Sequence, residues 1–160
     1  MCSSPSKSTH TPTFWNAPTI EAGVGAKLNL RIGGKISPLS GDPLDLACTV
    51  KAIRLDHTQT GLSNTVVHMG ECALVECQGV EILLVTLRNQ AMGTDLFTGI
   101  GCDLSNKKVV VVKSSQHFHA SYSKVASHII YAAAPGAVTL DLRTLPYRKI
   151  RRPKWPIDAD

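Results

Sequence analysis

Apolar and polar residues alternate along the first half of the chain, a pattern typical of strands that bury one face. The alternation is regular over residues 27–32, and it returns over residues 44–55, where Leu46, Cys48, Val50 and Ala52 fall on the same side. A short helix is predicted before them over Ala17–Ala22, ended by glycines that accept left-handed backbone conformations.

Two further runs, 72–77 and 80–87, are separated only by Gln78-Gly79. Glycine supplies the positive φ that a tight hairpin needs, so these runs are expected to pair with each other. Residues 80–85 are nearly all apolar, which favours a position inside the sheet. We therefore predict an antiparallel meander for the first two-thirds of the chain.

The last third has a different pattern. Residues 107–113 carry four consecutive valines between lysines, and residues 129–133 are again apolar. A helical stretch ending near His128 separates them, which predicts a β-α-β unit with parallel strands. The fold class is thus α+β: a largely antiparallel sheet followed by this unit, in a single domain over residues 16–160. Residues 1–15, rich in Ser, Thr and Pro, are predicted to be disordered.

Composition supports a globular protein, with 43% hydrophobic and 18% charged residues. No apolar run is long enough to cross a bilayer, and the amino terminus lacks the apolar core of a signal peptide, so no membrane partner is expected. The five cysteines are odd in number and show no C-x-x-C spacing. Free buried thiols, and with them a cytoplasmic location, are the expectation.

The net charge of +5 comes from the carboxy-terminal tail, where residues 147–154 hold five basic residues and no acid. The other 12 basic residues equal the 12 acidic ones in number. Pro146, Pro153 and Pro156 exclude a recognition helix from this tail, so we expect a strap packed on the domain and no nucleic-acid partner.

Candidate chemistry gathers at Lys113, Ser114, Ser115 and His117, which lie between a predicted strand and a predicted helix. Backbone N–H groups at such a junction hold anions, with Lys113 as the counter-charge and the two hydroxyls as donors. The alternative is that Ser114 or Ser115 only caps the helix. Gly34 and Lys35 form a second candidate, either a plain turn or a substrate-facing loop, since they lack the P-loop pattern.

A metal site cannot be assembled from the sequence. The six histidines include no H-E-x-x-H motif, and the only dense group, His117-Phe118-His119, has no acid or cysteine nearby. Catalytic zinc needs three protein ligands. We therefore assign this chain no catalytic residue and no metal ligand.

Six blocks of sequence, in order and with matching spacing, carry a family resemblance: 21–26, 31–35, 41–44, 111–118, 134–136 and 145–148. The chain resembles, from about Ala17 to Asp158, the carboxy-terminal region of the MlrC-type metallopeptidases. The resemblance implies a zinc-dependent hydrolase, known for cutting linearised microcystin, whose metal ligands belong to an amino-terminal domain.

That resemblance implies that the chain is inactive alone, because Met1–Trp15 stands where the metal-binding domain would be. Its expected partners are a peptide substrate and that domain, carried on the same polypeptide or on a separate chain, as in a split or truncated protein. The alternative is a stand-alone binding or interaction domain that has lost the peptidase function.

Overall fold

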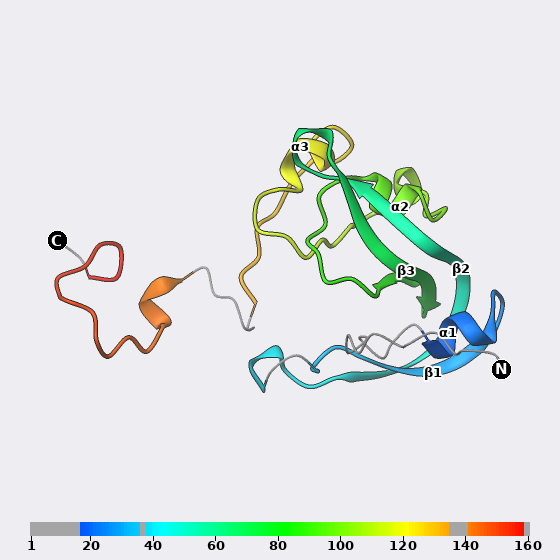
Figure 1. Ribbon diagram of the computed structural model, residues 1–160, viewed down its shortest axis with the longest axis horizontal. Helices are drawn as coiled ribbons and strands as arrows, with labels where there is room; N and C mark the ends of the chain where they lie inside the picture. The colour runs from blue at the N-terminus through cyan, green and yellow to red at the C-terminus, as the bar shows by residue number, and fades with distance from the viewer. Residues whose placement is uncertain (1–16, 36–37, 135–140, 159–160) are drawn as a thin grey trace, which may run out of the picture. The chain divides into compact units, whose positions relative to one another are not determined.

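The computed structural model describes residues 17–35, 38–134 and 141–158 (Figure 1). The predicted disorder of residues 1–15 lies outside them. The described helices and strands are α1 (Ala17–Ala22), β1 (Lys27–Ile32), β2 (Leu44–Thr60), β3 (Val66–Cys77), β4 (Val80–Val85), α2 (Asp95–Thr98) and α3 (His119–Tyr122). Short 3-10 turns lie at Pro38–Ser40, Leu62–Asn64, Leu104–Asn106 and Leu142–Thr144.

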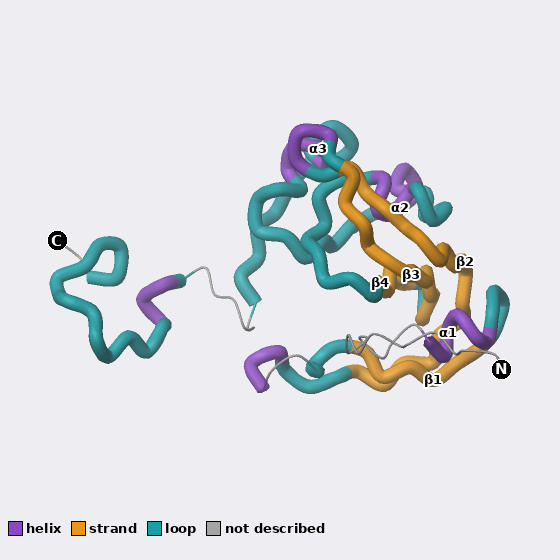
Figure 2. Tube along the Cα trace, viewed as in Figure 1, coloured by secondary structure: helices purple, strands orange, loops and turns teal. Residues whose placement is uncertain are grey.

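The four strands form one sheet in the order β1-β2-β3-β4 (Figure 2), and both β2–β3 and β3–β4 are antiparallel. The α+β class with an antiparallel meander is therefore confirmed. The described residues group into two compact units: the first unit contains residues 17–30 and 46–128, and the second contains residues 31–35, 38–45, 129–134 and 141–158.

The β3–β4 hairpin forms where the sequence predicts it. Cys77 pairs with Val80, and the two loop residues have positive φ, 51° at Gln78 and 83° at Gly79. Two positive φ values define the turn whose twist matches the strands it joins. The Gly79 N–H also donates to Glu76 Oε1 at 2.6 Å, which ties the turn to the end of β3.

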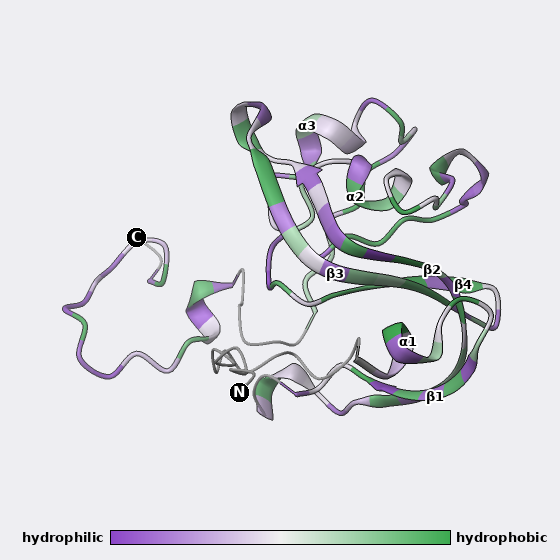
Figure 3. Ribbon diagram, turned by 45° about the vertical axis from the view of Figure 1, so that its right-hand side comes forward, coloured by the Kyte–Doolittle hydropathy of each residue, from purple (hydrophilic) through white to green (hydrophobic). Residues whose placement is uncertain are grey.

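β2 and β3 are longer than the alternation predicts, because each strand continues through residues that interrupt the regular pairing or backbone conformation. β2 continues past Leu55 to Thr60 with register shifts against β3 near Val50, Arg54 and His57. β3 passes through Gly70, whose φ of 72° only glycine adopts readily. Hydrophobic residues, green in Figure 3, recur along β3.

The core of the first unit joins β3 to the chain that follows the hairpin. Its fully buried members come from β3, from α2 and from the loops around α2: Met69, Cys72, Leu74, Ala91, Leu96, Ile100 and Cys102. Residues far apart in sequence thus bury a common apolar surface, which is the main source of stability for the unit.

The predicted β-α-β unit is wrong. Residues 107–113 and 129–133 lie in loops, and the helix between them, α3, has only four residues. Figure 2 shows loop (teal) leading into α3. Valine-rich composition favours a strand, but a strand exists only when its backbone pairs with a neighbour. Ile130 in the second segment is 87% exposed, so nothing in its own unit buries it.

The four described cysteines, Cys48, Cys72, Cys77 and Cys102, are buried and free, as predicted. Burial raises the pKa of Cys72 to about 12. Burial, and secondarily a hydrogen bond to Glu81, raise the pKa of Cys102 to about 11. The Cys72 and Cys102 thiols therefore stay protonated at neutral pH and serve packing, because the thiolate is the reactive form. No helix in the described ranges is long and apolar enough to cross a membrane.

Alkaline pH is expected to weaken the first unit through Cys102. The Cys102 thiol donates to Glu81 Oε2 at 3.1 Å, and the same oxygen pairs with Lys107 Nζ at 2.8 Å. Because the folded pKa of about 11 exceeds the ordinary 9.0, the neutral thiol stabilises the fold fully below pH 9, and this contribution is lost as pH rises through 11. The urea midpoint should fall less between those pH values in Cys102→Ser than in the native chain. An identical fall in both proteins would contradict this assignment.

Candidate functional site

The strongest candidate residues lie on one turn of the first unit, residues 113–119, here called the Lys113–His119 turn. Lys113, Ser115, His117 and His119 are exposed on it, Ser114 is half-buried, and Phe118 is buried. The turn therefore presents an ammonium group, a hydroxyl and two imidazoles to solvent from one short segment.

Both ends of this turn are attached to residues 90–93. At its start, Ser114 Oγ donates to Gln90 Oε1 at 3.1 Å, and the Ala91 N–H donates to the Lys113 carbonyl at 3.5 Å. At its end, the Phe118 ring packs edge-on against Tyr122 with centroids 6.2 Å apart. The Tyr122 hydroxyl then donates to the Gly93 carbonyl at 3.2 Å.

Residues 90–93 are in turn held by Gln59, a β2 side chain that is only 1% exposed. Its amide nitrogen donates to the Gln90 carbonyl at 2.7 Å and to Met69 Sδ at 3.1 Å. Its amide oxygen accepts the N–H groups of Met92, at 2.8 Å, and Gly93, at 3.2 Å. One buried side chain thus satisfies three backbone groups of the loop that supports the Lys113–His119 turn.

Neighbouring residues of β2 anchor α2 in the same way. His57 is buried, and its Nε2–H donates to the Leu96 carbonyl at 2.8 Å. Asp95 Oδ2 accepts both the N–H and the hydroxyl of Thr60, at 2.7 and 2.8 Å. Asp95 Oδ1 is buried and has no hydrogen-bond partner in the part of the chain that the structure describes.

Sequence reasoning missed Gln59 and His57. The available signal was the alternation of β2, because residues two apart on a strand face the same side. From sequence alone, however, two polar residues on one side of a strand are read as facing solvent. Only the partners that β2 meets in the fold show that these side chains are satisfied inside.

The helix-end reasoning behind the anion site is wrong. α3 begins at His119, has four residues, and its N-cap Phe118 makes no side-chain hydrogen bond. Neither Ser114 nor Ser115 caps it, so the alternative interpretation is wrong as well, and so short a helix offers no appreciable dipole. Contact of Lys113, Ser114, Ser115 and His117 with a substrate stays a prediction that rests on the exposed turn itself.

The second candidate, Gly34 and Lys35, belongs to the second unit. Gly34 has a φ of 66°, and a Cβ on it would lie 2.5 Å from Pro43 N and 2.6 Å from the Gly41 carbonyl oxygen. Glycine is therefore required here by backbone packing, whichever of the two interpretations holds. Lys35 is exposed, and its contact with a substrate stays a prediction.

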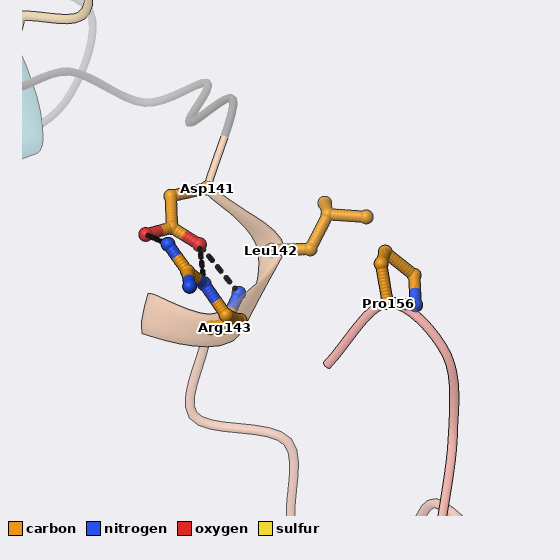
Figure 4. A pocket seen from close by; sticks show the side chains of 4 residues that line it. All are labelled: Asp141, Leu142, Arg143 and Pro156. Atoms are coloured by element: carbon orange, nitrogen blue, oxygen red, sulfur yellow. Dashed lines mark hydrogen bonds and ion pairs between the residues drawn. The ribbon is translucent and has the colours of Figure 1, made fainter. Parts of the chain in front are cut away.

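The second unit also has a small open pocket lined by Asp141, Leu142, Arg143 and Pro156 (Figure 4). Arg143 binds Asp141 through Nε, at 2.8 Å, and Nη2, at 2.9 Å. These bonds lower the pKa of the Asp141 carboxyl. Because the charges of this pair neutralise each other, the pocket offers no free charge of its own for a ligand.

Zinc does not fit the residues described. No three His, Cys, Asp or Glu side chains among them lie close enough to hold a metal ion. His117 and His119 are neighbours in sequence without a third donor, whereas catalytic zinc takes three protein ligands.

This chain is similar to a protein family, to a curated protein and to a solved structure. The family described as MlrC C-terminus matches residues 15–149. Microcystinase C from Sphingomonas sp. is 31% identical over 138 residues, which are 86% of this chain and 26% of that protein. A crystal structure from Mesorhizobium sp. BNC1, described as a candidate metallopeptidase, shares the fold with a TM-score of 0.72 at 24% identity. It is matched over 88% of this chain and 28% of that one. The chain thus spans about a quarter of the length of the curated relative it matches.

Proposed function

This chain belongs to the MlrC C-terminus family, and on this premise we propose that it is the substrate-contacting part of a zinc metallopeptidase that hydrolyses linear peptides. The family prediction made from six sequence blocks is confirmed. Microcystinase C is about three times as long as this chain, so the transfer of a peptidase activity, with zinc and a peptide substrate, to this chain is our proposal.

The observation that carries the proposal is the Lys113–His119 turn. Its polar groups are exposed, yet they stand on a loop whose backbone is held by the buried Gln59 amide. Exposed side chains on a rigid support are what a binding site requires, because less entropy is lost when substrate is bound. Lys113 suits a substrate carboxylate, and His117 can exchange hydrogen bonds with peptide groups.

We place the zinc ligands outside the 160 residues, because the described donors do not form a metal site. A zinc ion held by those ligands would supply Lewis-acid chemistry for peptide hydrolysis. The role left to this chain is to bind and orient the peptide, in partnership with the metal-binding domain. A cytoplasmic location, supported by four free buried thiols, is part of the same proposal.

The proposal is tested by measuring zinc and peptide cleavage in the purified chain, first alone and then mixed with a metal-binding domain from the family. We expect no stoichiometric zinc and no cleavage by the chain alone, and cleavage in the mixture. One zinc per chain together with cleavage by the chain alone would overturn the proposal. Peptide binding by the chain without cleavage in the mixture would favour the stand-alone binding domain.

In the active assembly, Lys113→Ala and His117→Ala are expected to lower kcat/KM by about tenfold or more, equivalent to about 1.4 kcal/mol of transition-state stabilisation. Zinc content and the urea midpoint should not change, because both side chains are exposed. Lys124→Ala is the matched control, an exposed lysine that lies outside the turn. Equal kinetics in all three variants would remove these residues from the site.

A further inference from the structure

The segment Val109–Val112 has the composition of a strand, but none of the described strands pairs with it. Its side chains alternate in exposure: Val109 is 77% exposed, Val110 36% and Val111 83%, while Val112 packs against the core cluster. An alternation with a period of two is what one strand of a half-buried sheet shows. The outer valines remain in solvent.

The backbone of the segment is likewise unpaired. The Lys107 N–H bonds to the Leu104 carbonyl just before it, and the Lys113 carbonyl accepts the Ala91 N–H just after it. Between these two attachments, residues 108–112 have no hydrogen-bond partner within the described ranges. An edge of this kind, anchored at both ends and apolar, accepts an added strand.

We propose that residues 109–112 form a docking edge, on which a β-strand from the metal-binding part of the peptidase is added. This inference rests on the proposed function, because it takes its occupant from the rest of that enzyme. The relatives contain additional polypeptide from which such a strand can come. The matched portion is 26% of microcystinase C and 28% of the Mesorhizobium chain, so most of each protein lies outside it.

Charge argues against a second copy of the chain as the occupant. Lys108 and Lys113 are exposed at the two ends of the segment. A second copy added antiparallel and in register would place Lys108 opposite Lys113 at both ends, and like charges directly opposite each other destabilise strand pairing. A strand with apolar residues at alternate positions and acidic residues near its ends fits both the valines and the lysines.

The test uses the intact chain and synthetic peptides of about 15 residues that tile the unmatched portion of microcystinase C, since strand addition needs only an extended segment. Hydrogen exchange at the amides of residues 109–112 is measured with each peptide. We expect at least one peptide to slow exchange there by about tenfold or more. Val111→Pro, which removes a backbone donor, should abolish the effect. Val111→Thr keeps both the donor and the β-branched shape and should retain it.

Three results would overturn the inference: no peptide slows exchange, the segment is already protected in the dilute chain alone, or protection appears only as the chain concentration rises. The last would identify a second copy as the occupant. Because exchange is measured without zinc or cleavage, this test is separate from that of the proposed function. Restored cleavage with an unprotected segment would remove only the docking edge, and protection without cleavage would remove only the peptidase role.

Discussion

Gln59→Ala is expected to lower the free energy of unfolding by about 2–4 kcal/mol, because a buried hydrogen-bonding group left unpaired costs about 1–3 kcal/mol. The Gln59 amide satisfies the Gln90 carbonyl and the N–H groups of Met92 and Gly93, and alanine satisfies none of them. Urea unfolding followed by circular dichroism measures the change. Hydrogen exchange at Met92 and Gly93 should accelerate more than at Gln78 and Gly79, the turn at the opposite end of β3 from Val67, with which Gln59 pairs.

Gln116→Ala is the matched control for this variant. It removes the same atoms from an exposed glutamine and should change stability by less than about 0.5 kcal/mol. Gln59→Glu provides a second check, because it keeps an acceptor for the two N–H groups but loses the donor to Gln90. It should therefore remain destabilised. A Gln59→Ala protein as stable as Gln116→Ala would show that the 90–93 loop does not depend on this side chain.

Gly93→Ala is expected to destabilise the first unit by about 2–3 kcal/mol, at the upper end of the usual cost of overpacking. A Cβ on Gly93 would lie 2.0 Å from Asp95 Oδ1 and 2.7 Å from the Thr60 carbonyl oxygen. Asp95 is held by two bonds to Thr60, and the Thr60 carbonyl oxygen belongs to the backbone, so no side-chain rotation moves it away. Thermal unfolding of the variant measures the effect.

Gly23→Ala separates steric conflict from the general cost of replacing glycine. Gly23 has a φ of 81°, and nothing lies within 4 Å of the position of its Cβ. It should lose only about 1–2 kcal/mol for a left-handed residue. If Gly93→Ala unfolds at the same temperature as the native chain, the close approach of residues 93 and 95 is not a feature of the folded protein.

Gln59→Ala and Gly93→Ala both alter the support of the Lys113–His119 turn without touching its exposed groups. In an active assembly we therefore expect them to impair substrate binding through a displaced turn, since Tyr122 and Ser114 bond to residues 93 and 90. Partial loss of activity in a protein that still folds would be consistent with a positioning role.

Local sequence signals predicted the antiparallel part of the fold well. The β3–β4 hairpin follows from Gln78-Gly79, because the residues that adopt positive φ are few and their position sets the register of the strands. The burial of Cys48 and Val50 follows from alternation, since every second side chain of a strand faces the same way.

The strand prediction for residues 107–113 failed for a reason that composition cannot show. β-branched residues make a segment suited to a sheet, but pairing depends on an available edge, and no edge is supplied to it by the described part of the chain. The exposed valines of this segment are therefore one of the observations behind the proposed docking edge.

By itself the sequence determined the family, the antiparallel meander and the free thiols, because each depends on local composition, spacing or order. Tertiary structure decided that Gln59 supports the Lys113–His119 turn and that residues 109–112 remain an open edge. The reason is physical: hydrogen-bond partners from distant segments determine whether a buried polar group is satisfied and whether an apolar segment becomes a strand.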